Sequence, residues 1–174
     1  GITGWIDWTR DLTKEAHILQ AMTSKLADRG PDAEGYWTSS HALLGHRRLI
    51  VVDPDGGAQP MVKKRNDNVY VITYNGELYN TEDIRRVLLA KGHRFVSYSD
   101  TEVLLTAYIE WGEECLSRLN GIFAFAIWDA SKETLFMARD RLGVKPLFYT
   151  QAGTSFMFSS QIKALLANPL VSSE

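Results

Sequence analysis

The stretch Tyr74-Asn75-Gly76-Glu77-Leu78-Tyr79-Asn80 decides the predicted fold. A run of β-formers, residues 69–74, leads into it, and a helical pattern follows it. Asn80 is the expected N-cap of that helix, with Asp83 at its third position. Asn75-Gly76 is therefore predicted at the end of a strand, where a side-chain amide and a glycine N–H can stabilise a developing oxyanion. Asn-Gly is also a common tight-turn pair, and local chemistry alone favours the turn.

The composition of the chain indicates one globular domain. With 174 residues, 45% of them hydrophobic, the chain is long enough to bury a sizeable core. Its net charge of −2 gives no reason to expect binding to nucleic acid or to an anionic membrane. No apolar run approaches the roughly 20 residues that cross a bilayer, and no signal peptide is apparent in the first residues.

The cysteine and histidine content argues against disulfides and metals. Cys115 is the single cysteine, so no internal disulfide can form and a cytoplasmic setting is expected. It lies in an amphipathic helix pattern, where a buried, inert thiol is the expected state. The four histidines have no ligand spacing with one another or with Cys115, so we expect no metal site.

Strand patterns dominate the chain and occur in clusters. This favours α+β architecture with largely antiparallel sheets over a doubly wound parallel fold. The segment Lys63-Lys64-Arg65 is interpreted as a solvated basic turn. Strands are predicted at residues 2–8, 34–38, 42–48, 69–74, 95–96, 123–127, 134–139, 147–149 and 156–158, and helices at residues 14–26 (capped by Thr13 or Asp11), 81–91, from 99 to Gly112, 115–119 and 162–166.

Seven separated stretches, which together span nearly the whole chain, form one pattern. They are Gly1-Ile2-Thr3-Gly4, Arg29-Gly30-Pro31-Asp32, Gly45-His46-Arg47-Arg48-Leu49, residues 74–80, Ser99-Asp100-Thr101-Glu102, residues 120–125 and residues 139–147. In this order they resemble the glutamine amidotransferase domain of glutamine-hydrolysing asparagine synthetases, a class II amidotransferase. The Arg-Gly-Pro-Asp and Tyr-Asn-Gly-Glu forms fit this branch better than the amidophosphoribosyltransferase or hexosamine-synthase branches.

The resemblance implies an N-terminal-nucleophile hydrolase fold, a four-layer αββα sandwich of two antiparallel sheets flanked by helices. It assigns residues 1–168 to the glutaminase domain and residues 169–174 to the start of a linker. It implies glutamine as substrate and no cofactor in this domain. ATP and magnesium are expected only for a following synthetase domain, which would use the ammonia to amidate aspartate. The oligomeric state is left open, with a homodimer as one option.

The resemblance also implies a nucleophile directly before Gly1, because the family pattern begins Cys-Gly-Ile. A cysteine thiolate would attack glutamine, and its own α-amine, with a pKa of roughly 7.7–8.0, would act as the base. The sequence starts at Gly1. Three explanations are open: a cysteine that is modified and so not represented, one removed by design, or a natural loss. We favour the first, since the other pocket motifs are intact.

Positions that match the family motifs give the remaining site residues. Arg48 is expected to pair with the glutamine α-carboxylate, a task that suits a planar bidentate donor. The apolar run Leu49-Ile50-Val51-Val52 would form the pocket wall, and it also fits a core strand. Asn75 and Gly76 match the oxyanion donors, and Glu77 is the third residue of that binding loop.

Asp100 matches the carboxylate that receives the substrate ammonium. Without the resemblance it would be interpreted as a helix-capping or first-turn acid, worth about 1 kcal/mol to the helix. Arg48 and Asp100 together would supply one charge for each end of an α-amino acid. Arg47 and His46 are interpreted as structural residues.

Two alternatives to a glutaminase with an asparagine synthetase partner stay open. One is a domain without a nucleophile that binds glutamine or only packs against a partner. The other is the same glutaminase serving a different acceptor domain. A smaller departure from the family pattern is Gln161, which stands where a glutamate is common.

Overall fold

The structure is a computed structural model that describes residues 1–49 and 57–173. Its elements, in chain order, are β1 (Ile2–Asp7), α1 (Ala16–Ser24), β2 (Ala33–Thr38), β3 (Ala42–Arg48), β4 (Met61–Arg65), β5 (Asn68–Leu78), α2 (Thr81–Ala90), α3 (Asp100–Trp111), the 3-10 helix η1 (Gly112–Arg118), β6 (Gly121–Asp129), β7 (Thr134–Arg139), β8 (Phe148–Ala152), β9 (Ser155–Ser159) and α4 (Ile162–Leu166).

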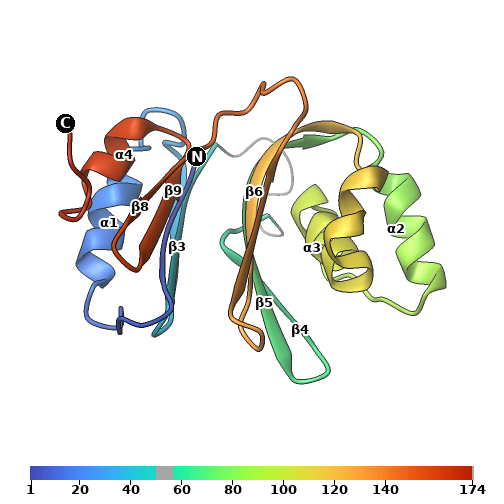
Figure 1. Ribbon diagram of the computed structural model, residues 1–174. Coiled ribbons are helices and arrows are strands. Elements are labelled where there is room, and N and C mark those ends of the chain that lie inside the picture. Colours follow the sequence, from blue (N-terminus) through green and yellow to red (C-terminus); the bar gives the residue numbers. More distant parts are fainter. Residues whose placement is uncertain (50–56, 174) are drawn as a thin grey trace.

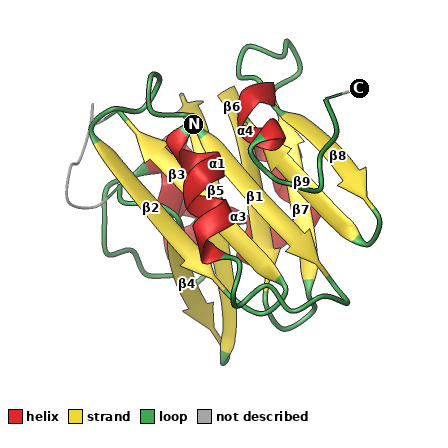
Figure 2. Ribbon diagram, turned by 90° about the vertical axis from the view of Figure 1, so that its left-hand side faces the viewer, coloured by secondary structure: helices red, strands yellow, loops and turns green. Residues whose placement is uncertain are grey.

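The strands form two sheets of antiparallel pairs, in the orders β2-β3-β1-β9-β8 and β4-β5-β6-β7. The two sheets lie face to face in Figure 1, with α1 and α4 outside the first sheet and α2 and α3 outside the second. The view in Figure 2 places α1 in front of the first sheet and α3 behind the second. This arrangement confirms the predicted α+β class and the four-layer αββα sandwich.

Strand β6 shows how the two sides of a sheet divide the core. Ala124, Ala126 and Trp128 face the first sheet, where they pack with Ile2 and Ile6 of β1. The residues between them, which include Phe125 and Ile127, pack against α3 instead. Since side chains alternate along a strand, small residues on one side let the sheets approach while large residues on the other side fill the layer under the helix.

The first sheet is covered in the same way. Trp5, Leu43 and Met157 point outward and pack against Leu19 and Met22 of α1. The layer outside the second sheet is deeper. There α2, α3 and η1 enclose a further cluster, which includes Cys115. Burial raises the pKa of the Cys115 thiol to about 12, so this cysteine stays protonated.

Strand β5 runs further than the sequence indicated. It continues through Asn75 and Gly76 to Leu78 and pairs with β6 along its length. The prediction that Asn75-Gly76 ends the strand is therefore wrong, and so is the tight turn that local chemistry favoured. The pairing partner, which is distant in sequence, overrides the local turn preference.

Local capping also differs from the prediction. Helix α1 begins at Ala16 and has no side-chain cap, because Asp11 accepts hydrogen bonds from Thr13 in a turn before the helix. Asn80 does precede α2, but its side chain makes no cap bond. It bonds instead to the Arg118 carbonyl and to the Asn120 N–H, which ties the start of α2 to the end of η1.

Two further segments were assigned wrongly from the sequence. Lys63, Lys64 and Arg65 form the end of strand β4 and pair with β5, so the predicted turn is wrong, although Lys64 and Arg65 are exposed. Phe95 and Val96 belong to no strand and lie in an irregular segment between α2 and α3. The partly buried ion pair between Lys63 and Glu102 explains the first error, because Glu102 lies 39 positions away from Lys63 in the sequence.

The spacing between the sheets yields a stability prediction. Ala126→Val adds volume to the face of β6 that packs on the first sheet, where Ala126 is fully buried. We expect a loss of about 1–3 kcal/mol in the free energy of unfolding, measured with urea. Val62→Leu, which enlarges an exposed side chain of β4, is the control and should change stability little. Equal stabilities for Ala126→Val and the unsubstituted protein would contradict close packing of the two sheets.

Candidate functional site

A cleft of about 560 Å³ lies where the first strand begins and where β3, β5 and α3 bring their ends together. Figure 1 shows the N-terminus between the tops of the two sheets, beside the segment that joins β7 to β8. The cleft is lined by Gly1, Arg29, His46, Arg47, Arg48, Leu49, Gly57, Gln59, Tyr74, Asn75, Gly76, Glu77, Leu78, Thr81, Glu82, Tyr98, Ser99, Asp100, Thr101 and Lys145.

Tyr74 on β5 connects several walls of this cleft. Strand β4 begins at Met61, opposite Ile72, so no β4 residue pairs with Tyr74. The side chain of Gln59 takes that place and accepts a hydrogen bond from the Tyr74 N–H at 2.6 Å. The Tyr74 carbonyl accepts from Nε2 of His46 on β3 at 2.9 Å. A long-range network thus satisfies the backbone groups that the sheet leaves unpaired.

His46 is buried in this network and is neutral. Burial is the largest cause that lowers the pKa of His46, which falls to about 3, and the charge of nearby Arg48 lowers it further. Because the partner atom is a carbonyl oxygen, the proton of the neutral ring must sit on Nε2. His46 therefore fastens β3 to β5 directly beside the cleft, in line with the structural role expected from the sequence.

Asp100 is held in the cleft by the side chain of the same tyrosine. Its Oδ2 accepts from the Tyr74 hydroxyl at 2.8 Å and from the Leu78 N–H at 3.2 Å. Burial and then the negative charge of Asp100 raise the pKa of Tyr74, so the hydroxyl stays a donor. Asp100 is the first residue of α3, but Ser99 is its N-cap. Asp100 is therefore not the cap, but it is an acid of the first helical turn, as the other half of that alternative predicted.

Asn75 and Gly76 lie on the stretch of β5 that borders the cleft. Thr73, two residues earlier, points to the first sheet and donates to the Gly45 carbonyl at 3.1 Å. Alternation along the strand places Asn75 on that same side, between the sheets. At Gly76 the backbone of β6 is so close that a Cβ atom would collide with the Ile122 carbonyl oxygen. Glycine is therefore required here.

The end of β3 forms the opposite wall. Arg48 is partly buried, and its carbonyl accepts from the Asp32 N–H at 3.0 Å, which fixes its backbone to the segment before β2. Leu49 lines the cleft and is 58% exposed, so it is a rim residue rather than core. The predicted wall residues Ile50, Val51 and Val52 lie outside the described residues.

Positive side chains surround the start of β1. The Gly1 nitrogen donates to the Arg47 carbonyl at 2.7 Å. Lys145, Arg29 and Arg47 place positive charge near this nitrogen. Arg47 is itself tied to the fold, because its guanidinium donates to the Gly30 carbonyl and to Glu34.

Lys145 reaches this position on a loop that a buried carboxylate organises. Asp140 accepts from the backbone N–H groups of Val144 at 2.9 Å, Lys145 at 3.2 Å and Phe123 at 3.3 Å. Burial alone would raise the pKa of Asp140, but these donors lower it overall. The loop after β7 is thus anchored to β6 as well as to itself.

The cleft contains the described members of the predicted site, which are Arg48, Leu49, Asn75, Gly76, Glu77 and Asp100. The sequence did not single out Gln59, Arg29, Tyr74, Tyr98 or Lys145 as site residues. Four of these, all except Gln59, lie in or next to the seven stretches quoted above. Their position in or beside these stretches could have identified them as candidate site residues. Among residues 1–49 and 57–173, no group of three His, Cys, Asp or Glu side chains could hold a metal.

Comparison with known proteins identifies the family. The chain matches the glutamine amidotransferase domain family over residues 1–174. It is 57% identical over 169 residues to asparagine synthetase [glutamine-hydrolyzing] 3 of Bacillus subtilis, covering 97% of this chain and 28% of that protein. It is 39% identical over 158 residues to asparagine synthetase B [glutamine-hydrolyzing] of Escherichia coli, covering 90% and 27%.

Among solved structures, the fold resembles glutamine phosphoribosylpyrophosphate (PRPP) amidotransferase from B. subtilis complexed with ADP and GMP. The TM-score is 0.78 at 22% identity, covering 95% of this chain and 43% of that one. The chain belongs to the glutamine amidotransferase domain family. It spans less than a third of the length of the two asparagine synthetases compared above. No helix in the described ranges is long and apolar enough to cross a membrane.

Neutral, buried His46 leads to a pH prediction. Between pH 6.5 and about 3 the unfolded chain binds a proton on His46 that the folded chain does not, so stability falls as the pH falls through this window. We expect His46 to account for a loss of about 2 kcal/mol in unfolding free energy between neutral pH and pH 5. Denaturation in urea at several pH values measures this loss.

The control for this experiment is His46→Gln, whose side-chain amide can still donate to the Tyr74 carbonyl but does not titrate. The stability of this variant should depend less on pH between 6.5 and 5. Parallel pH profiles for His46→Gln and the unsubstituted protein would contradict a neutral His46 in the fold.

Proposed function

We propose that this domain hydrolyses glutamine to glutamate and ammonia. The observation that carries the proposal is the convergence of Arg48, Asn75, Gly76 and Asp100 on one cleft in a chain of the glutamine amidotransferase family. These residues come from three different elements, β3, β5 and α3, so their meeting is a property of the fold rather than of one motif.

The two ends of the cleft suit a free amino acid. Arg48 is proposed to bind the substrate α-carboxylate and Asp100 the α-ammonium. Since Tyr74 and the Leu78 N–H hold Asp100 at Oδ2, the carboxylate is oriented before the substrate arrives. A ligand that lacked either charge would lose one of these two charge-assisted contacts. This supports an α-amino acid as substrate rather than any amide.

The proposed reaction uses a cysteine directly before Gly1. Its thiolate attacks the side-chain amide carbon of glutamine, and the Asn75 side-chain amide and the Gly76 N–H stabilise the oxyanion. The α-amine of the cysteine takes the thiol proton and passes it to the departing nitrogen, which leaves as ammonia. Water then hydrolyses the thioester to glutamate. The positive charges of Lys145, Arg29 and Arg47 near Gly1 support this proposal, because they favour a thiolate, whereas burial at the same place favours a thiol.

The partner and setting are part of the same proposal. The relatives named above are glutamine-hydrolysing asparagine synthetases, so we propose that the ammonia passes to an asparagine synthetase domain in the same protein. ATP and magnesium would serve that domain, with no cofactor in this one. The single, buried cysteine of the chain supports a reducing, cytoplasmic setting. A glutaminase for another acceptor, or a binding domain without a nucleophile, are the competing functions.

The direct test uses the intact natural protein. Its mass and N-terminal sequence show whether a cysteine precedes Gly1, and release of glutamate from glutamine is measured before and after alkylation with iodoacetamide. We expect such a cysteine and activity that alkylation abolishes. A protein that truly starts at Gly1, and that binds glutamine without releasing glutamate, would support the binding domain instead.

The roles of Arg48 and Asn75 can be separated by kinetics. Arg48→Ala should raise the KM for glutamine by roughly tenfold or more, since this contact is equal in ground state and transition state. Asn75→Ala should mainly lower kcat, by roughly 100-fold, because the oxyanion forms only during reaction. Arg86→Ala, at an exposed arginine of α2 that pairs only loosely with Asp83, is the control. Equal effects on KM and kcat for both site variants would disprove this division.

Asp100→Asn tests recognition of the ammonium group. The variant retains an oxygen that can accept from Tyr74 and Leu78, but it loses the negative charge. We expect a rise in KM of roughly tenfold or more, with a fold that is unchanged by circular dichroism. Asp83→Asn removes an exposed carboxylate from α2 and serves as the matched control. A KM for Asp100→Asn equal to that of the control would contradict the assignment.

A further inference from the structure

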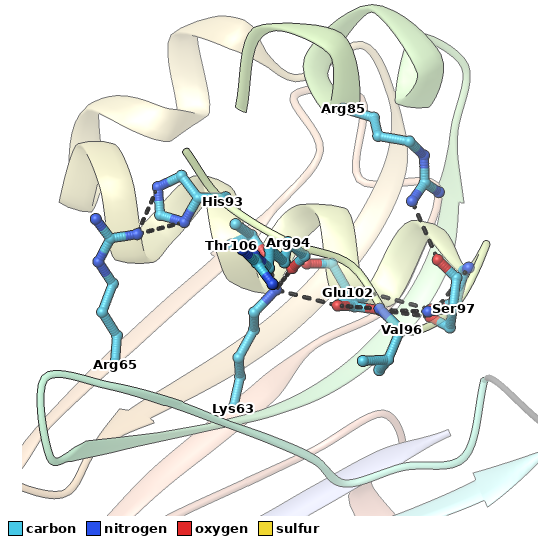
Figure 3. A network of polar contacts seen from close by, with 10 residues as sticks. Lys63, Arg65, Arg85, His93, Arg94, Val96, Ser97, Glu102 and Thr106 are labelled. Carbon is cyan, nitrogen blue, oxygen red and sulfur yellow. Dashed lines mark hydrogen bonds and ion pairs between the residues drawn. The ribbon is translucent and has the colours of Figure 1, made fainter. Parts of the chain in front are cut away.

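The segment from Arg94 to Ser99, which joins α2 to α3, has no regular secondary structure. Despite this, its backbone groups are bonded to three charged side chains from three different elements. Figure 3 shows Lys63 of β4, Arg85 of α2 and Glu102 of α3 converging on this segment. Irregular segments are usually held by few such contacts and are mobile. It is therefore unusual that three charged side chains bond to the backbone of this segment.

Glu102 makes the largest number of these contacts. Its carboxylate accepts from the Val96 N–H at 3.1 Å, from the Ser97 N–H at 2.8 Å and from the Ser97 hydroxyl at 2.7 Å. The side chain is only 3% exposed. Burial alone would raise the pKa of Glu102, but the bonds from Ser97, Lys63 and Val96 lower it overall, so the carboxylate is charged.

The sequence Ser99-Asp100-Thr101-Glu102 has the form of a capping box, in which the glutamate would bond back to the N–H of the cap residue. In the structure Ser99 does cap the helix, since its hydroxyl accepts from the Glu102 N–H at 3.2 Å. The glutamate side chain, however, reaches past Ser99 to Val96 and Ser97. Glu102 thus fixes the chain that leads into α3 rather than the helix end itself.

Lys63 neutralises the buried carboxylate and holds the segment at a second point. Its ammonium group donates to Glu102 at 3.0 Å, to the Thr106 hydroxyl at 2.7 Å and to the Arg94 carbonyl at 2.9 Å. These three acceptors match the three hydrogens of an ammonium group. A buried ion pair is costly unless such bonds complete it, and here they join β4, α3 and the start of the segment.

Arg85 holds the segment from the α2 side. It donates to the Ser97 carbonyl at 3.1 Å, so Ser97 is bonded at its N–H, hydroxyl and carbonyl. The ring of Phe95 is close to two cations, with Lys63 Nζ 4.6 Å and the Arg85 guanidinium carbon 4.9 Å from its centre. Cations over an aromatic ring attract it, which fixes the side chain of Phe95 as well as the backbone.

The residues that follow this anchored segment form one wall of the cleft. Tyr98, Ser99, Asp100 and Thr101 all line it. Tyr98 is 84% exposed and lies 5.9 Å from the Arg85 guanidinium carbon, so the same arginine contacts the segment on both sides of Ser97. The anchored segment therefore leads directly into Asp100, the residue proposed to hold the substrate ammonium.

We propose that Glu102 is a positioning residue of the cleft. With Lys63 and Arg85, it holds residues 94–99 in a preformed conformation, so that Tyr98 and Asp100 are in place before an amino acid binds. Glu102 does not line the cleft itself and acts through Val96 and Ser97. The inference deepens the proposed glutamine hydrolysis and rests on it for its kinetic part, whereas the anchoring of the segment is independent of that function.

The test is Glu102→Gln in the intact natural protein, because glutamine keeps the size of the side chain but presents an amide. Its NH₂ group must face either the N–H donors of Val96 and Ser97 or the Lys63 ammonium. We expect hydrogen exchange at the Val96 and Ser97 amides to become at least about tenfold faster. The KM for glutamine should rise roughly tenfold while kcat changes less than about twofold, because a displaced wall weakens ground state and transition state alike.

Ser97→Ala is the milder second variant, which stays informative if Glu102→Gln does not fold. It removes the hydroxyl bonds of Ser97 to Glu102 and to Ser99 but keeps the bond from the Ser97 N–H to Glu102, and we expect smaller changes in the same direction. Glu113→Gln, at an exposed position of η1, is the matched control and should change neither exchange nor KM.

The results separate this inference from the proposed function. If the unsubstituted protein releases no glutamate from glutamine, the proposed function fails, while the exchange rates still test the anchoring. Unchanged exchange at Val96 and Ser97 in a folded Glu102→Gln protein would overturn the inference. If the protein is an active glutaminase, equal KM values for Glu102→Gln and Glu113→Gln would also overturn the inference. The anchoring of residues 94–99 would then have no effect on the cleft.

Discussion

The hydrogen bonds of Tyr74 are the constraint on which the site depends. Its N–H, carbonyl and hydroxyl bond to Gln59, His46 and Asp100, which lie on three other parts of the chain. Because β4 does not extend to Tyr74, these backbone groups would otherwise lack partners at the edge of the sheet. Satisfying them brings the end of β3 and the start of α3 to the same stretch of β5, where the cleft opens.

This arrangement needs two sheets that pack closely and in one register. Alanines on the inner face of β6 allow the approach, and the large residues of the same strand serve the helical layer. A one-residue slip of β6 would turn Phe123, Phe125 and Ile127 toward the first sheet. The bulk of these side chains would hold the two sheets apart, and the bond between His46 and Tyr74 spans the two sheets. The packing of the core and the geometry of the site are therefore specified together.

The seven family stretches contain much of the lining of the cleft, including Arg48, Asn75, Gly76 and Asp100. They could not show that Asn75-Gly76 continues a strand, because its partner β6 lies about 50 residues later. For the same reason the sequence indicated a surface position for Lys63, because its ion-pair partner Glu102 is distant in the sequence. No sequence pattern marked Gln59, because its hydrogen bond from the Tyr74 N–H depends only on where β4 begins.

The sequence by itself determined the class of fold, the order of most strands and helices, and the family, because alternation, turn residues and separated motifs are properties of the chain. Only the tertiary structure decided which side chains share the cleft and which ones hold it. Those relations join residues that are far apart in sequence, such as His46 with Tyr74 and Lys63 with Glu102. Buried polar groups must find partners wherever the packing places them, and local pattern contains no record of that placement.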